Sequence, residues 1–488
     1  MSASSEKKIV LAAICIYIIV FGVFTGLRHY NFQTQAWDMG IFDQTFWNTA
    51  HGRFMENSFE TAKNHLGIHM SPFLVLLAPG YALFPSPYFL LIIQTIALAL
   101  GAWPLYLLAK KVLSGFDKKW PVIITLSYLF YPALHWINTF DFHELPFLIP
   151  LLLTSFYFIE TKKWLWTTIF LALSASVKED AILVVMFMGI YIFIKSGKNK
   201  SIKETQNIEN KKFLGIKKFG ALTAIFSLIY FIAATKIIMP SLGGGLLSIN
   251  RYSQLGGSVA EIAKNLFTNP WLFIKTIFAA QKMGYVFWLL VPAGFMTLFS
   301  GPVLLTLVPP LAENLLSSWN SQVSGLYHYD ALLIAGIFAG LVYGLKFFLN
   351  HWPKKQKIAI VALLVAGAAS FLIRSPISPF LFPTELFRPN AHWDAYREII
   401  KKIPANASVA AQTNLVPHLS KRQNIYVLGT EPSQADILII DGADLTGFTD
   451  EKTFQTYADS YMDSGLYNFT AIENRYFILN KKDIELLQ

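Results

Sequence analysis

The sequence has little charge and almost no cysteine. Only 14% of its 488 residues are charged, whereas 54% are hydrophobic, and the mean hydropathy is +0.44. Soluble domains of this length do not have such a composition, so an integral membrane protein is indicated. Cys15 is the one cysteine. A disulfide within the chain and a structural zinc site of several cysteines are therefore excluded.

A net charge of +10 would by itself suit a nucleic-acid partner. The lysines, however, lie in short segments between apolar runs, which is their usual place on the cytoplasmic side of membrane proteins. We therefore expect membrane lipid and no nucleic acid as a partner.

Long apolar runs recur as far as Ile373. Ile9–Leu27 contains no charge and would reach about 28 Å as a helix, close to the hydrocarbon thickness of about 30 Å. No small-residue cleavage site follows it, which favours an uncleaved signal anchor over a cleaved signal peptide. The sequence predicts roughly eleven to twelve spans. After the first they are Tyr88–Leu108, Trp120–Ile137, Leu145–Ile159, Trp164–Val177, Ala181–Ile194, Phe219–Ile238, Tyr285–Phe299, Val303–Leu316, Ala331–Phe348 and Ile358–Ile373, with Pro72–Phe84 as a re-entrant or interfacial piece.

The lysines predict the orientation of the chain. If the spans alternate, one face receives the lysine pairs and clusters, and the positive-inside rule makes that face cytoplasmic. These residues are Lys7, Lys8, Lys110, Lys111, Lys118, Lys119, Lys162, Lys163, the lysines of the loop Lys195–Lys218 (among them Lys198, Lys200 and Lys203), Lys346, Lys354, Lys355 and Lys357. We thus predict a multi-pass plasma-membrane protein with a cytoplasmic N-terminus. Residues 28–71 and everything after Ile373 would face outward.

The tail after Ile373 changes in character. Arg374-Ser375-Pro376 starts a linker, and short β-like runs then alternate with helix-like stretches. The predicted strands are Ser408–Ala411, Asn424–Leu428, Ile437–Ile440 and Tyr476–Leu479, and the predicted helices are Trp393–Lys402 and Thr453–Ser464. The predicted fold is therefore an all-α polytopic membrane bundle, residues 1–373, followed by a small extracytoplasmic α/β domain, residues 374–488.

The first outer loop, residues 28–71, contains several carboxylates and histidines among tryptophans and phenylalanines. An ordinary polar loop is the alternative interpretation. The spacing of Ile41, Phe42, Thr45 and Phe46 predicts an amphipathic helix lying on the membrane, with Asp38 near its start. A partly desolvated carboxylate there would serve as a general base. The polar residues of the loop are Asp38, Asp43, His51, Glu56, Glu60, His65 and His69.

A second polar cluster, Asp141-Phe142-His143-Glu144, stands at the outer end of a span. Carboxylate and imidazole ligands suit a divalent cation, Mg or Mn, and His65 and His69 would extend such a ligand set. The alternative is a helix cap, with Asp141 as the capping residue and Glu144 in the first turn. No other cofactor is expected.

Three further groups lie at predicted outer span ends. Lys178-Glu179-Asp180 is either a short turn or a site in which Lys178 binds a phosphate and the two acids assist. Arg251 follows a flexible glycine run and is a second candidate for the phosphate. Glu313 precedes Tyr327-His328-Tyr329, where aromatic residues are usual at a membrane interface but a histidine between tyrosines is not. His328 and Tyr329 are therefore predicted to bind substrate.

The chain resembles the predicted multi-pass membrane proteins of domain-of-unknown-function family two thousand and seventy-nine, over nearly its whole length. That family is similar to the GT-C glycosyltransferases, such as the protein mannosyltransferases and the aminoarabinose transferase of lipid A. The motifs that carry the resemblance are Trp37-Asp38-Met39-Gly40-Ile41-Phe42-Asp43-Gln44, His65-Leu66-Gly67-Ile68-His69-Met70-Ser71-Pro72, Asp141-Phe142-His143-Glu144, Lys178-Glu179-Asp180, Tyr327-His328-Tyr329 and Pro417-His418-Leu419-Ser420-Lys421-Arg422.

The resemblance implies a glycosyltransferase that moves a sugar from a polyprenyl-phosphate donor to an acceptor at the outer face. It gives Asp38 the role of the first-loop acid, which is the catalytic base or a metal partner in the characterised transferases. Asp43, Glu179 and Asp180 would support it. The alternatives are a transporter or flippase for a lipid-linked precursor, although no two matching halves are visible, and a non-catalytic membrane protein.

Overall fold

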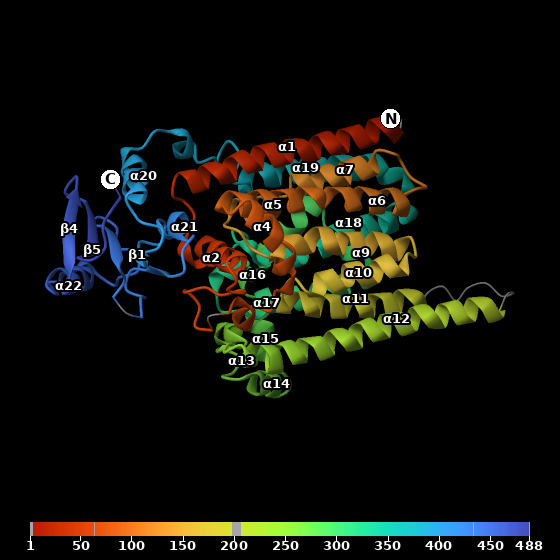
Figure 1. The fold of residues 1–488 in the computed structure, drawn as a ribbon. Helices are drawn as coiled ribbons and strands as arrows, with labels where there is room; N and C mark the ends of the chain where they lie inside the picture. The colour runs from red at the N-terminus through yellow and green to blue at the C-terminus, as the bar shows by residue number, and fades with distance from the viewer. Residues whose placement is uncertain (1–2, 63, 198–205, 433, 488) are drawn as a thin grey trace.

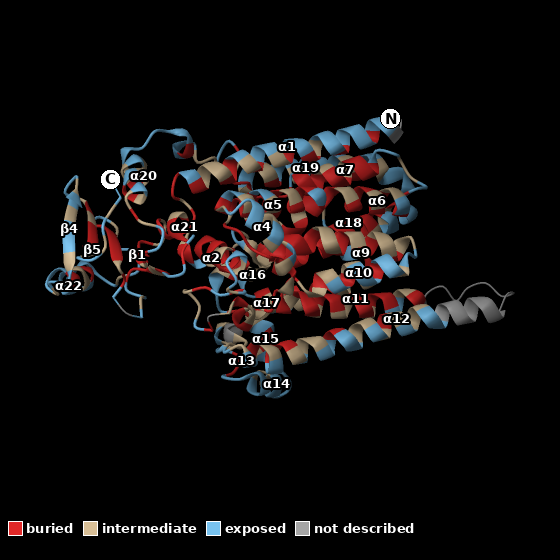
Figure 2. Ribbon diagram, viewed as in Figure 1, coloured by how far each residue is buried: buried red, intermediate tan, exposed pale blue. Residues whose placement is uncertain are grey.

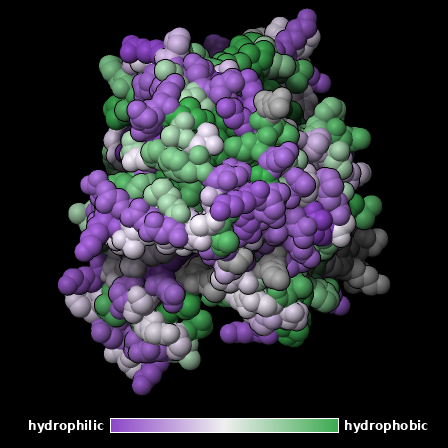
Figure 3. Space-filling model, turned by 60° about the vertical axis from the view of Figure 1, so that its left-hand side comes forward, coloured by the Kyte–Doolittle hydropathy of each residue, from purple (hydrophilic) through white to green (hydrophobic). Residues whose placement is uncertain are grey.

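The computed structural model describes residues 3–62, 64–197, 206–432 and 434–487. A bundle of roughly parallel helices forms one body, and a small sheet domain sits at one end of it (Figure 1). Viewed with that end turned forward, the molecule has hydrophilic residues over much of its surface, with hydrophobic residues between and beside them (Figure 3).

The apolar runs form the helices of the bundle. They are α1 (Ala3–Tyr30), α5 (Pro87–Leu100), α6 (Ala102–Val112), α7 (Trp120–Leu129), α8 (Pro132–Thr139), α9 (Leu148–Glu160), α10 (Trp164–Ala175), α11 (Glu179–Gly197), α12 (Gln206–Ala233), α16 (Ala280–Leu290), α17 (Val308–Leu316), α18 (Ala331–His351) and α19 (Gln356–Arg374). The predicted span Trp120–Ile137 is divided between α7 and α8, because Pro132 has no N–H to continue the first helix.

Five helices of the described chain are long and apolar enough to cross a membrane, namely Ser4–Tyr30, Pro87–Val112, Leu214–Ser241, His328–His351 and Pro353–Arg374. Leu145–Glu160, Trp164–Ala175 and Gly301–Leu316 are apolar but shorter. The span within His328–His351 is 78% buried, whereas those within Leu214–Ser241 and Pro353–Arg374 are 22% buried. Helix α18 is therefore the centre of the bundle, and α12 and α19 lie at its edge (Figure 2).

The two ends of the bundle differ. The N-terminus and the turn between α6 and α7, with its lysines, lie at the end opposite the sheet domain (Figure 1). This arrangement agrees with lysines gathered on one face, and the assignment of that face to the cytoplasm stays a prediction. Part of the predicted lysine-rich loop, with Lys198, Lys200 and Lys203, falls outside the described residues.

The first outer loop folds into a compact cap on the bundle. A π-helical turn, η1 (Ala36–Gly40), leads into α2 (Ile41–Ala50), and α3 (His65–Ile68), η2 (Pro72–Leu76) and α4 (Ala78–Leu83) follow. The helix predicted to lie on the membrane is instead buried on both faces: Phe42 and Phe46 are covered, and so are Asp43, Gln44 and Asn48. That prediction was wrong because the sheet domain packs against the side of α2 that would otherwise meet solvent.

The sheet domain holds five strands in the order β2-β1-β3-β5-β4. Strand β1 pairs in parallel with β2 and β3, and β5 runs antiparallel between β3 and β4. The elements are α20 (Ala391–Lys401), β1 (Val409–Ala411), α21 (Val416–Leu419), β2 (Ile425–Val427), β3 (Ile437–Asp441), α22 (Glu451–Met462), β4 (Tyr467–Ile472) and β5 (Tyr476–Lys481). Sequence patterning located all of them except α21 and the edge strand β4, whose side chains are half-buried or exposed throughout.

The sheet domain and the first outer loop share an apolar core. Phe32 and Ala36 of the loop pack among the residues of the domain. Asp43 is fully buried between them and accepts hydrogen bonds from Ser420 Oγ at 2.6 Å and from Tyr81 Oη at 2.7 Å. Gln44 Nε2 donates to the carbonyl of Arg422 at 3.1 Å. These contacts fix η1, which carries Asp38, against the domain.

Candidate functional site

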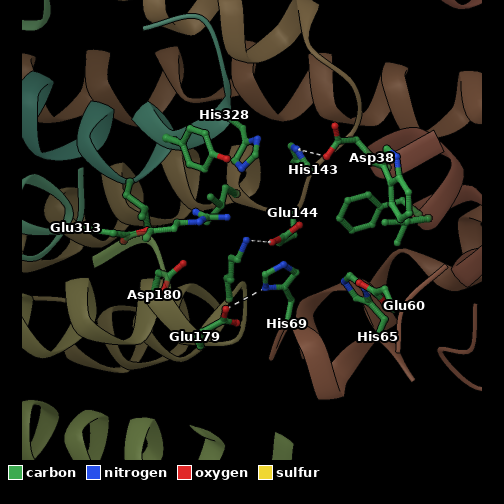
Figure 4. A pocket seen from close by; sticks show the side chains of 18 residues that line it. Asp38, Glu60, His65, His69, His143, Glu144, Glu179, Asp180, Glu313 and His328 are labelled. Carbon is green, nitrogen blue, oxygen red and sulfur yellow. Dashed lines mark hydrogen bonds and ion pairs between the residues drawn. The ribbon is translucent and has the colours of Figure 1, made fainter. Parts of the chain in front are cut away.

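A cavity of about 160 Å³ lies at the end of the bundle next to the sheet domain, beneath η1 and α2. It is lined by side chains that are far apart in the sequence: Trp37, Asp38, Ile41, Phe42, Glu60, His65, His69, His143, Glu144, Leu145, Lys178, Glu179, Asp180, Arg251, Glu313, His328, Tyr329 and Leu332. Figure 4 shows Asp38, Glu60 and His65 on one side of the cavity and Asp180 and Glu313 on the other, with His69 and Glu144 between them.

Asp38 faces His143 within the cavity. Asp38 Oδ1 lies 3.2 Å from His143 Nε2, and the aspartate side chain is 26% exposed whereas the histidine is 8% exposed. Gln94 holds the histidine backbone in place, because its Oε1 accepts from the His143 N–H at 2.8 Å. The carboxylate is therefore oriented by a histidine and still open to the cavity, as a group that receives a proton must be.

Lys178 forms an ion pair with a buried carboxylate. Its Nζ lies 3.0 Å from Glu144 Oε1, and the Glu144 side chain is 1% exposed. Burial lowers the pKa of Lys178, but the carboxylates of Glu144, Glu179 and Asp180 outweigh burial and raise it. Burial likewise raises the pKa of Glu144, and Lys178 together with the nearby histidines outweighs it and lowers the pKa. Both groups are therefore charged at neutral pH.

The two loop histidines are each held by an acid. His69 Nδ1 lies 3.0 Å from Glu179 Oε1, and the other oxygen of Glu179 accepts from the Met70 N–H at 2.8 Å. His65 Nδ1 lies 3.0 Å from Glu60 Oε2. Glu179 opens α11, so its contacts tie the first outer loop to the bundle.

Arg251 lines the cavity together with the carboxylates of Asp180 and Glu313, which act on it electrostatically but form no ion pair with it. Its guanidinium stands over the rings of Trp319 and Tyr329, 4.4 Å and 5.5 Å from their centroids. Among the residues that the structure describes, no carboxylate lies within ion-pair distance of it. Stacking orients the guanidinium and leaves its N–H donors available to an anion.

His328 completes the wall beside His143. The ring centroids of the two histidines are 3.7 Å apart, and His328 Nδ1 is buried with no hydrogen-bond partner among the described residues. Tyr329 also lines the cavity. A buried imidazole nitrogen without a partner is costly unless a ligand or water meets it.

Most of the predicted site residues meet in this cavity, and two do not line it. Asp141 points to the loop backbone, where its Oδ2 accepts from the Gln35 N–H at 2.6 Å, and Asp43 bridges Tyr81 and Ser420. The alternative of a helix cap made by Asp141 is wrong, because the Asp141 carboxylate accepts from Gln35 N–H and the residue at the N-cap of the following turn is Glu144, whose side chain makes no capping hydrogen bond. Sequence reasoning missed Gln94, although a buried amide within an apolar span is a signal of function.

Four of the five predicted metal ligands line the cavity, but they do not form one ligand set. In the described part of the chain, no group of three or more His, Cys, Asp and Glu side chains is placed to hold a metal ion. Instead His143 faces Asp38, His65 faces Glu60, His69 faces Glu179 and Glu144 faces Lys178. This donor set does not match a metal centre, so no step below passes through one, and the divalent cation stays a prediction.

Comparison with known families decides the membership of the chain. The model of the family described as "Predicted membrane protein (DUF2079)" matches residues 28–478. The chain belongs to the DUF2079 family. The match begins just before η1 and ends within β5, so it includes both the cavity and the sheet domain. No curated protein matches the sequence of this DUF2079 member.

Two solved structures are similar to the DUF2079 chain. ArnT from Cupriavidus metallidurans, bound to undecaprenyl phosphate, is similar over 98% of both chains with a TM-score of 0.54 and 10% identity. The Archaeoglobus fulgidus oligosaccharyltransferase, tethered to an acceptor peptide, has a TM-score of 0.45 and 12% identity, with coverage of 96% of this chain and 74% of the other. The likeness to ArnT shows that the two chains share a fold.

Proposed function

We propose that this protein is a glycosyltransferase that moves a sugar from a polyprenyl-phosphate donor to an acceptor hydroxyl. The observation that carries the proposal is the convergence of Asp38, His143 and Arg251, from three distant segments, on one cavity at the end of the bundle next to the sheet domain. The fold shared with ArnT, whose structure contains undecaprenyl phosphate, supports a lipid-linked donor.

The basic groups suit the phosphate of such a donor. Arg251 offers a guanidinium without a carboxylate partner in the described chain, and Lys178 Nζ, paired with Glu144, has further N–H donors. When the bond between the anomeric carbon and the phosphate oxygen breaks, the leaving phosphate gains negative charge. Donors already fixed in place stabilise this developing charge most effectively.

The acid and its histidine suit the acceptor side of the reaction. The acceptor oxygen forms the new bond to the anomeric carbon, the lipid phosphate leaves with the bonding electrons, and the Asp38 carboxylate takes the hydroxyl proton. With its proton on Nε2, His143 donates to Asp38 and directs the free carboxylate oxygen into the cavity.

The first test is donor binding by the full chain in lipid nanodiscs, with undecaprenyl phosphate as the probe. Titration should show saturable binding that Arg251→Ala weakens about tenfold or more. Arg388→Ala removes an exposed arginine that is not part of the cavity and should bind as wild type. Equal affinities of wild type and Arg251→Ala would contradict the proposed phosphate site. Uptake of the lipid into vesicles with no covalent transfer of sugar would favour a transporter.

A further inference from the structure

A second and larger cavity adjoins the first. Its volume is about 520 Å³, and it lies between the first outer loop and strand β2 of the sheet domain. We call it the outer groove and define it by Asn57, Phe59 and Glu60 on the loop side and Asn424, Tyr426 and Thr430 on the domain side. Glu60 lines both cavities, so the outer groove leads to the wall of the central one.

The two walls of the groove are fixed to each other. Ser58 Oγ donates to the Ile425 carbonyl at 2.5 Å and accepts from the Ile425 N–H at 3.1 Å. Gln44 Oε1 in turn accepts from the Ser58 N–H at 2.8 Å. The groove is therefore preformed, which reduces the ordering cost of binding a ligand.

The lining favours a neutral, hydroxyl-rich ligand. The side-chain amides of Gln423 and Asn424 and the hydroxyl of Tyr426 make no hydrogen bond to the described residues. Amides and phenols offer donors and acceptors together, as adjacent hydroxyls require, and an aromatic ring adds an apolar face. The carboxylates of Glu56 and Glu60 also line the groove, as does Arg53, whose guanidinium donates to Asn48 Oδ1 and lies over the Trp47 ring. The two acids outnumber the one cation, so the lining disfavours an anionic ligand.

An extended peptide fits this groove less well. Peptides commonly bind by adding a strand to a free sheet edge, and β2 is an edge strand of this sheet. Ser58 already occupies both the N–H and the carbonyl of Ile425, the first residue of β2. Recognition here falls to side chains rather than to a backbone ladder.

The two cavities meet at a carboxylate that is held rigidly. Glu60 Oε2 accepts from Asn57 Nδ2 at 2.6 Å and lies 3.0 Å from His65 Nδ1. Trp37, next to the catalytic aspartate in sequence, packs edge to face on Phe59 of the groove, with ring centroids 6.4 Å apart. Glu60, at the end of the groove, lies on the same side of the central cavity as Asp38 (Figure 4).

We propose that the outer groove is the acceptor subsite and binds a neutral saccharide, one hydroxyl of which reaches past Glu60 into the central cavity. This inference rests on the proposed glycosyltransferase function and names the class of its acceptor. It also assigns roles to Asn424 and Tyr426, which no motif of the sequence had singled out.

The test presents the full chain in lipid nanodiscs to an array of neutral oligosaccharides, anionic oligosaccharides and serine- or threonine-containing peptides. Neutral oligosaccharides should be retained. Asn424→Ala and Tyr426→Phe should each weaken that retention about tenfold, as expected for one lost hydrogen bond. Asn406→Ala, an exposed asparagine of the same domain outside the groove, is the matched control and should bind as wild type.

Undecaprenyl phosphate titration of the same variants separates the two proposals. Asn424→Ala should leave lipid-phosphate binding unchanged. Retention of peptides instead of saccharides, or saccharide binding that neither groove variant weakens, would overturn the acceptor subsite while lipid-phosphate binding still stands. Saccharide retention without any lipid-phosphate binding would instead contradict the proposed function and leave the groove as a saccharide site.

Discussion

Two lysines at opposite ends of the bundle have different surroundings. At the end opposite the sheet domain, Lys195 Nζ donates to Glu160 Oε2 at 2.6 Å, to Tyr191 Oη at 3.1 Å and to Tyr343 Oη at 3.2 Å. An ammonium has three donors, and all three are used. At the cavity, Lys178 Nζ has one carboxylate, Glu144, at 3.0 Å. Both side chains are lysines near the ends of apolar helices, yet only one has its hydrogen bonds complete.

The difference separates a structural role from a binding role. A charged group whose donors are all satisfied within the protein stabilises the fold and offers nothing to a ligand. At the cavity, the buried Glu144 Oε2 and His328 Nδ1 have no hydrogen-bond partner in the described chain. Burial without partners costs free energy. We therefore attribute this arrangement to ligand binding rather than to packing.

The largest expected effect comes from removing the proposed base, Asp38, in the central cavity. Asp38→Asn preserves the shape of the side chain but cannot accept the proton, so sugar transfer should fall by about 10²–10⁴-fold. Because Asp38 is 26% exposed, the thermal midpoint should stay near that of wild type. Single-turnover transfer of labelled sugar from the lipid donor measures the loss. A normal transfer rate would remove Asp38 from the chemistry.

A smaller loss should separate charge from geometry at Arg251. Arg251→Lys keeps the positive charge but loses the planar group that stacks on Trp319. We expect lipid-phosphate affinity to fall between those of wild type and Arg251→Ala, by severalfold to about tenfold. Titration with undecaprenyl phosphate measures it. If lysine restored full affinity, stacking would have no part in presenting the charge.

The opposite pattern is expected at Lys195, whose three N–H donors are all used within the protein. Lys195→Met removes three hydrogen bonds and leaves Glu160 without its cation, so the fold should lose about 1–3 kcal/mol. Lipid-phosphate binding and sugar transfer should remain at wild-type levels. Thermal unfolding of the purified chain gives the first quantity and the titration gives the second. Lys355→Met, at an exposed position of the same end, is the control and should change neither.

The sequence alone predicts the helices and the candidate residues, but it does not predict which of these residues pair. Apolar runs predicted the helices of the bundle. Ionisable side chains are costly beside apolar spans and commonly have a function there, so the predicted span ends indicated the candidate residues Asp38, His143, Lys178, Arg251 and His328. Which of these groups pair with each other depends on the packing of distant segments and has no local signal.

The sheet domain made the placement of α2 unpredictable. Apolar residues at helical spacing correctly predicted a helix after Asp38, but the partner that buries its second face lies hundreds of residues later, at Ser420 and Arg422. Asp43 and Asp141 were wrongly placed in the site because their partners also lie in distant segments of the chain. Each is an acid within a motif, and only the folded chain shows that one binds Tyr81 and the other a backbone N–H.

The smallest effect concerns an ion pair on the wall shared by the two cavities. Burial lowers the pKa of His65, but Glu60 outweighs it and raises the pKa above 6.5. Burial raises the pKa of Glu60, but His65 outweighs it and lowers the pKa below 4.5. The stabilisation from His65 is complete below pH 6.5 and is lost as the pH rises through its raised pKa. That from Glu60 is present above pH 4.5 and is lost as the pH falls through its lowered pKa.

Both contributions overlap between about pH 4.5 and 6.5, the two unfolded-state values. Glu60→Gln should therefore lower the thermal midpoint most within this window, and the deficit should shrink toward pH 8 as His65 loses its proton. Glu56→Gln, a change at an exposed neighbour on the same loop, should give a small difference that does not vary with pH. A Glu60→Gln deficit that stays constant from pH 5 to 8 would mean that His65 remains neutral and that the pair is held by hydrogen bonding alone.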